Sequence, residues 1–226
     1  MRLLLVVVLC VGLAGCASAK RPENKPKSQA EAPVVLRGPS PEEQAKVDQV
    51  LGPLVSTSGI CRPGEPCTVG LAIEPLQRIH LAAGPAPPKK FVIRITTGAL
   101  RSLESSELQA ALAHELGHVQ LGHFESREER RMAERSTEPG PKGTGDEALR
   151  ANRASDRDEE FAADRYAVEL LDQLPGSPGH GCADMLLLLE RLDLEQLSPG
   201  WTNWMSTHPT PAARLTALQA ECNKKP

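Results

Sequence analysis

The sequence has 226 residues, a formal net charge of −3 and only 3% aromatic residues. It lacks the basic stripe and the rings with which proteins follow phosphates and stack on bases, so we expect no nucleic-acid partner. Its length suits one domain with appended segments. A hydrophobic fraction of 40% is normal for a packed core, whereas 20 prolines and 18 glycines indicate much loop or linker.

The first 15 residues have the pattern of a secretory signal peptide. Arg2 supplies a positive charge, and the apolar run 3–13 is shorter than the roughly 20 residues of a membrane-spanning helix. The run leads to Leu-Ala-Gly-Cys, which resembles the bacterial lipobox, so we expect cleavage before Cys16 and acylation of this cysteine. Plain secretion, with cleavage near 17–19, is the alternative.

The lipobox resemblance implies a lipoprotein of the bacterial cell envelope that faces the periplasm. The residue after Cys16 is alanine and not aspartate, which by resemblance to enterobacterial sorting favours the outer membrane over the inner one. Residues 16–40 contain few large apolar side chains and cannot bury enough surface to fold, so they predict a flexible tether. The folded domain is expected over 41–226.

Four cysteines remain once Cys10 leaves with the signal peptide and Cys16 takes lipid. They are Cys61, Cys67, Cys182 and Cys222. An even number in an oxidising compartment predicts two disulfides, and three pairings are allowed. The short, turn-rich loop between the first two favours their local closure, which leaves the last two for each other. A cysteine zinc site is disfavoured because no C-x-x-C pair is present.

The first part of the folded domain predicts one helix and one strand. Ser40 and Pro41 suit the cap and the first position of a helix that ends near the Gly-Pro pair at 52–53. The β-branched segment 91–96 predicts a strand. The proline-rich segment 85–88 predicts a loop.

The rest of the chain predicts mostly helix, so the fold class is mainly α with a small β-sheet. A short helical turn follows Gly98, and a central helix is expected to start near Ser106. This helix carries an apolar stripe typical of burial. The stripe consists of Leu108, Ala111, Leu112, Leu116 and Val119. Further helices are expected over 125–135, whose charges suggest a solvated segment, over 144–174 and 183–197, and from Pro211.

The central helix carries His-Glu-Leu-Gly-His at 114–118. Residues four apart lie on one helical face, so His114 and His118 can both reach one metal ion. Glu115 is placed to handle a metal-bound water but not to complete the ligand set. The pattern is typical of zinc peptidases, although a charged helical face that happens to carry two histidines is the alternative.

A catalytic zinc needs a third protein ligand. Leu121 and Phe124 stand where the three-histidine subclass has glycine and histidine, so that subclass is excluded. On a continuous helix His123 lies about 180° from His114 and faces away from the metal. His80 and His180 lack partner spacing and are expected to be structural.

The acidic segment 158–164 supplies a better ligand. Glu160 and Asp164 lie one turn apart, so Glu160 can bind the metal while Asp164 accepts a hydrogen bond from a ligating histidine. Glu159 has no carboxylate four residues on and is the less favoured ligand. A solvated acidic helix start is the alternative for the whole segment.

Four motifs occur in order along the chain. They are Thr97-Gly98-Ala99-Leu100; Glu107-Leu108 leading into His114 to His118; Glu160-Phe161-Ala162-Ala163-Asp164; and Thr207-His208-Pro209 with Arg214. Over residues 40 to 222 they resemble metallopeptidase family 48, which includes HtpX, the CAAX prenyl endopeptidases and periplasmic lipoproteins. The segment 76–84 departs from the family pattern at the edge where substrate binds.

The resemblance implies a zincin-like domain with one Zn²⁺ per chain. By resemblance His114, His118 and Glu160 bind the metal and Glu115 is the general base, while His208 and Arg214 belong to a catalytic motif near the metal.

The expected activity is that of a gluzincin-type zinc endopeptidase that degrades misfolded or unassembled envelope proteins, a role in protein quality control. An extended substrate is expected along the strand 91–96. A zinc-bound, gated or inactive chaperone-like lipoprotein is one alternative, and a structural lipoprotein with a fortuitous motif is another.

Overall fold

The computed structural model describes residues 37–61, 68–86, 90–136, 144–176, 178–196 and 209–224. In chain order the elements are α1 Pro41–Ser58, β1 Thr68–Glu74, β2 Leu81–Ala86, β3 Lys90–Thr96, α2 Thr97–Ser102, α3 Ser105–Gln120, α4 His123–Ser136, α5 Thr144–Asp172, α6 Gly181–Gln196 and α7 Pro211–Cys222. None of these helices is long and apolar enough to cross a membrane. The expected signal peptide, lipidation site and most of the tether lie outside the described residues.

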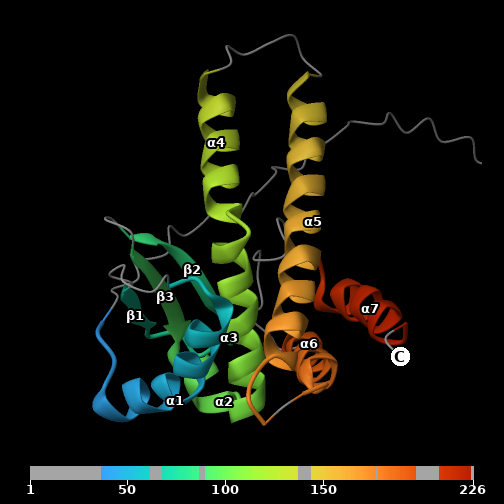
Figure 1. Ribbon diagram of the computed structural model, residues 1–226. Coiled ribbons are helices and arrows are strands. Elements are labelled where there is room, and N and C mark those ends of the chain that lie inside the picture. The colour runs from blue at the N-terminus through green and yellow to red at the C-terminus, as the bar shows by residue number, and fades with distance from the viewer. Residues whose placement is uncertain are drawn as a thin grey trace, which may run out of the picture. The chain divides into compact units, whose positions relative to one another are not determined.

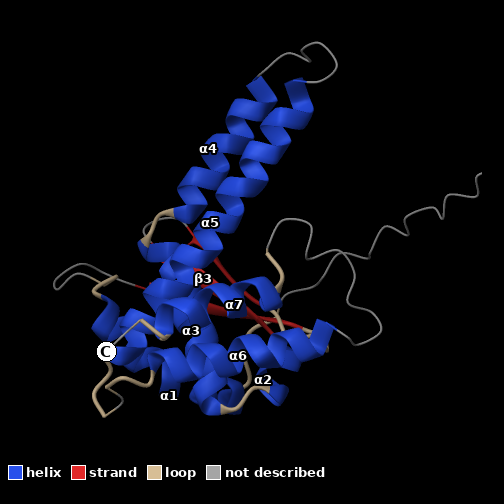
Figure 2. Cartoon of the chain, turned by 90° about the vertical axis from the view of Figure 1, so that its right-hand side faces the viewer, coloured by secondary structure: helices blue, strands red, loops and turns tan. Residues whose placement is uncertain are grey.

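The predicted fold class is confirmed, because helices predominate and a single small sheet accompanies them. The sheet has the order β1-β3-β2, with β1 parallel and β2 antiparallel to β3. Figure 1 shows the sheet on one side of α3 and the helices α5 and α6 on the other. In Figure 2, a quarter turn away, α3 lies among the other helices of the domain. The central helix is therefore enclosed, as its apolar stripe predicts.

The strand predicted over 91–96 is confirmed as β3, but the loop prediction is wrong at Pro85, which lies within β2. The carbonyl of His80 accepts a hydrogen bond from the amide of Thr96 across the sheet. Because bonded pairs alternate along antiparallel strands, Pro85 turns its nitrogen away from β3. Proline is tolerated at this position because an outward nitrogen takes no part in the ladder.

The predicted start of α1 is confirmed, whereas its predicted end is wrong. The Ser40 hydroxyl accepts from the amide of Glu43, and the Glu43 carboxylate accepts from the amide of Ser40. The helix continues through Pro53 to Ser58. Leu54, directly after the proline, is completely buried. Core packing of this side chain offsets the cost of a proline inside the helix.

Thr96 and the Thr-Gly-Ala-Leu motif that follows it tie the segment before β2 to the end of β3. The Thr96 hydroxyl caps α2 by accepting from Ala99, and it donates to the carbonyl of Arg78. The amide of Gly98 donates to the carbonyl of Leu76, and a Cβ on this glycine would lie 2.0 Å from the carbonyl oxygen of Gln77. These contacts fix the chain as it enters β2.

A disulfide joins Cys182 on α6 to Cys222 on α7, as predicted. The predicted pairing of Cys61 with Cys67 stays a prediction, because Cys67 lies outside the described residues. The disulfide closes a sequence separation of 40 residues. It therefore attaches the last helix, which carries Arg214, to the helix that carries Leu188.

Replacing both Cys182 and Cys222 by serine is expected to lower the free energy of unfolding by about 4 kcal/mol, because loop-closure entropy returns to the unfolded chain. Urea unfolding of the metal-free variant, followed by circular dichroism, measures the change. Replacing both cysteines leaves any other disulfide intact, which reductant would not. An unchanged urea midpoint would contradict this expectation.

Candidate active site

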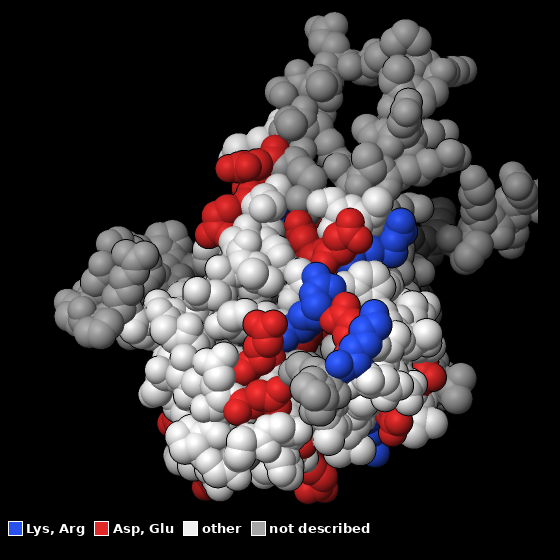
Figure 3. Space-filling model, turned by 45° about the vertical axis from the view of Figure 1, so that its right-hand side comes forward, with Lys and Arg blue, Asp and Glu red and all other residues white. Residues whose placement is uncertain are grey.

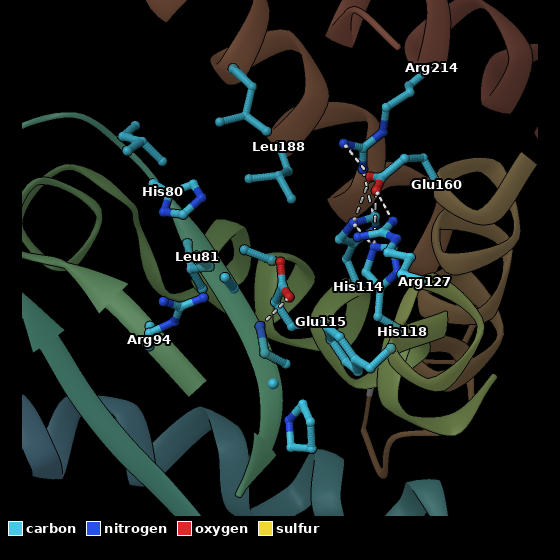
Figure 4. A pocket seen from close by; sticks show the side chains of 18 of the residues that line it. His80, Leu81, Arg94, His114, Glu115, His118, Arg127, Glu160, Leu188 and Arg214 are labelled. Atoms are coloured by element: carbon cyan, nitrogen blue, oxygen red, sulfur yellow. Dashed lines mark hydrogen bonds and ion pairs between the residues drawn. The ribbon is translucent and has the colours of Figure 1, made fainter. Parts of the chain in front are cut away.

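The site begins with the close crossing of α3 and α5. A Cβ on Gly117 would lie 3.1 Å from the carbonyl oxygen and 3.2 Å from the Cα of Ala163. Such contacts are tighter than side chains accept without movement, so the glycine allows the two backbones to approach. The approach brings Glu160 on α5 opposite the two histidines of α3, which Figure 4 shows pointing toward it.

Three side chains converge as a potential metal site. The Nε2 atoms of His114 and His118 are 3.1 Å apart. The first lies 3.3 Å from Oε2 of Glu160 and the second 3.3 Å from Oε1. Tetrahedral zinc with bonds near 2.0–2.1 Å would separate its ligand atoms by about 3.3 Å. All three residues are buried, and they form the potential metal-binding group among the described residues. The donor set and spacing therefore fit zinc.

Asp164 lies where a partner for His114 is expected. Its Oδ1 is 2.9 Å from the Nδ1 of His114, so a hydrogen bond there leaves Nε2 turned toward Glu160. Burial and Arg214 disfavour the charged imidazole, but Asp164 and Glu160 outweigh them and raise the pKa of His114 to about 9. A metal would therefore displace a proton from this ring.

Arg214 on α7 neutralises the buried carboxylate of Asp164. Its Nε donates to Oδ2 at 2.8 Å, and its Nη2 donates to Oδ1. Burial alone would raise the pKa of Asp164, but Arg214 and His114 lower it to about 2. Arg214 also places Nη1 3.5 Å from Glu160. It is thus packed beside the metal group, and its catalytic role remains a prediction.

Replacing Arg214 by alanine is expected to cost about 3–5 kcal/mol in the free energy of unfolding, because Asp164 keeps a buried charge without its partner. Arg165→Ala is the matched control, since Arg165 is 49% exposed in its pair with Glu221 and should cost less than about 1 kcal/mol. Urea unfolding of the metal-free proteins measures both. Equal losses for the two variants would contradict the expectation.

The general-base candidate Glu115 lies between the metal group and β2 and contacts the strand. Its Oε2 accepts a hydrogen bond of 2.7 Å from the backbone amide of Ala83 (Figure 4). Both sides of this contact border a cavity of about 490 Å³. Apolar side chains also line it, from Leu188 and Leu192 on α6 and from Ala111 on α3. The cavity therefore joins the metal group, the base and the strand.

One prediction about α4 is wrong, and the predicted solvated segment has an exception at Arg127. His123 does not face away from the metal group, because the chain turns at Gly122, which has φ of 69°. This turn ends α3, and α4 begins at His123. The restarted chain places Nδ1 of His123 2.8 Å from Nδ1 of His118. Arg127, expected on a solvated segment, donates to both Glu159 and Glu160. The glycine after the central helix is the sequence signal that could have revealed the break.

The remaining predicted residues are placed as follows. Glu159 pairs with Arg127 and is absent from the potential metal group. His80, expected to be structural, borders the cavity. His208 lies outside the described residues, so its expected role stays a prediction.

On the face drawn in Figure 3, the described basic side chains have acidic neighbours and form no continuous basic stripe.

The chain is similar to known proteins over part of its length. A family model described as peptidase family M48 matches residues 43–134, which run from α1 into α4 and include the two histidines and Glu115. The crystal structure of Ste24p from S. mikatae aligns with 19% sequence identity and a TM-score of 0.43. The alignment covers 78% of this chain and 55% of that one, so this chain spans about half of that protein. No curated protein matches.

Proposed function

Because the model of peptidase family M48, a family of metallopeptidases, matches residues 43–134, we propose that the chain belongs to this family and is a zinc-dependent endopeptidase of the gluzincin type. One observation carries the proposal. The ligand atoms of His114, His118 and Glu160 have the spacing of a tetrahedral zinc site, and they border the same cavity as Glu115. Two histidines and one glutamate leave a fourth position open for water, which distinguishes a catalytic from a structural zinc site.

The residues of the site then have distinct chemical tasks. When bound, zinc supplies Lewis-acid polarisation of the peptide carbonyl and acidifies a water molecule. The Glu115 carboxylate takes a proton from the attacking water and later delivers it to the nitrogen of the leaving amine. Asp164 holds His114 in the tautomer that leaves Nε2 available for metal.

The substrate strand needs revision from the sequence-based expectation. Since β3 is the central strand, with β1 and β2 on either side, it offers no free edge to a peptide. The outward edge of β2 borders the cavity instead, and Leu81 and Ala83 turn their backbone groups toward it. We expect an extended polypeptide to add along this edge, with side chains against the apolar residues that α6 contributes to the cavity.

Cleavage is expected in misfolded or unassembled envelope proteins, by a protein anchored to the outer membrane through acylated Cys16 and facing the periplasm. Support comes from the signal-like run, the lipobox and the polar segment 16–40. An extended-strand mode of binding suits unfolded polypeptides, because a folded protein rarely offers a free strand.

Zinc analysis and digestion of an unfolded protein test the function. The purified full-length protein is expected to hold about one zinc per chain, to digest casein, and to lose this activity on treatment with 1,10-phenanthroline. Casein left intact by zinc-loaded protein would favour the chaperone-like alternative. Absence of bound zinc would contradict the metal centre.

A further inference from the structure

The three metal ligands are each held by a further contact, but the contacts come from different elements. For His114 the partner is Asp164, on the helix that also supplies Glu160. The other two ligands are both contacted from the first turns of α4, where His123 meets His118 and Arg127 meets Glu160. This part of α4 has no role in the mechanism described above.

His123 reaches His118 because the chain turns at Gly122 and starts a new helix. The His123 side chain is buried, and its ring lies edge-on to that of His118 with centroids 5.0 Å apart. Two ring nitrogens 2.8 Å apart need one proton between them. Since the Nε2 of His118 faces the metal group, the proton belongs on its Nδ1, and Nδ1 of His123 accepts it.

Arg127 holds the carboxylate ligand. Its Nη2 donates to Oε1 of Glu160 at 3.1 Å, while its Nε donates to Oε2 of Glu159 at 2.7 Å. Arg214 lies 3.5 Å from the other oxygen of Glu160. The two guanidinium groups therefore fix the carboxylate from both of its oxygens. Arg127 is 23% exposed, so water screens its pair less than it screens a surface pair.

His123 and Arg127 are four residues apart and share one face of α4. We propose that they are positioning residues of the metal centre, in which His123 orients His118 and Arg127 orients Glu160. This inference rests on the proposed function, since it takes the three ligands to bind zinc. It makes the affinity for zinc depend on how α4 is seated, although α4 supplies no ligand.

The first test replaces His123 in two ways. His123→Phe keeps a ring but removes the acceptor, and it should weaken zinc binding by about 10–100-fold, the usual effect of losing such a partner. His123→Asn offers an oxygen near the position of Nδ1 and should recover most of the lost affinity. Competition of the full-length protein with a chromogenic chelator measures the zinc dissociation constant without any substrate.

The second test concerns the guanidinium. Arg127→Ala is expected to weaken zinc binding by about 10–100-fold. Arg127→Lys restores one charge but cannot contact both carboxylates in the same geometry, so it should recover only part of the loss. Arg165→Ala, which removes an exposed arginine of α5, should leave the dissociation constant unchanged.

The outcomes separate the two proposals. Unaltered zinc affinity in both His123→Phe and Arg127→Ala would overturn the inference while leaving the peptidase proposal in place. Zinc affinity kept in His123→Phe but lost in His123→Asn would show that the ring contributes packing and not an acceptor, which would also overturn it for His123. Zinc-loaded protein without peptidase activity would overturn only the proposed function. Thermal unfolding of each metal-free variant identifies any loss of folding.

Discussion

Glu115→Gln is expected to lower kcat/KM for casein or a peptide substrate by about 10²–10⁴-fold, the usual contribution of a general base. Glutamine keeps the size of the side chain and an oxygen that can accept from the amide of Ala83. It has no carboxylate to take a proton from water. The zinc content should stay near that of the unchanged protein, because Glu115 is not in the potential metal group.

Glu128→Gln is the matched control for this variant. Glu128 also borders the cavity, but it is exposed and lies on α4. Its replacement should leave kcat/KM within a few-fold of the original value, since surface substitutions seldom disturb a site. Full activity in Glu115→Gln would show that another group is the base, whereas loss of zinc from that variant would assign Glu115 to metal binding.

Glu160→Ala is expected to abolish stoichiometric zinc binding. The loss of affinity should exceed the about 10–100-fold typical for removal of a hydrogen-bonded partner, because a ligand itself disappears. The Glu160 side chain is only 1% exposed and its oxygens lie 3.3 Å from the Nε2 atoms of His114 and His118, so its removal leaves two of the three ligands. Equilibrium dialysis against zinc, followed by elemental analysis, measures the change.

Glu159→Ala supplies the comparison at the adjacent position. Glu159 contacts Arg127 and is not in the potential metal group, so this variant should keep its zinc. The pair of variants distinguishes a specific ligand from a general loss of negative charge. Zinc retained in Glu160→Ala, or lost equally from both variants, would refute the assignment of the third ligand.

Local sequence patterns predicted the elements that carry the site. The apolar stripe of α3, the Ser40-Pro41 pair and Pro211 predicted helices that the structure contains. Spacing of four residues placed Glu160 and Asp164 together, and the structure puts both beside His114. These features depend on contacts within a single helix turn, which is why the sequence alone displays them.

Contacts between distant segments were not predictable in the same way. Gly70 interrupts β1 and Pro85 interrupts β2, so neither strand has a clear alternating pattern. The pairing of Arg127 with Glu160 joins residues 33 positions apart, which a charged helix sequence does not reveal. The contact between His123 and His118 depended on the backbone turn at Gly122.

The proline in β2 has a consequence for the behaviour of the protein at high concentration. A sheet edge left open for a substrate can also pair with the same edge of a second copy, which is a common origin of aggregation. Pro85 removes one outward amide at the end of this edge, and the amide of Ala83 already donates to Glu115, while the amide of Leu81 still points outward. The edge can thus accept a short stretch of substrate while resisting continuous pairing with another copy.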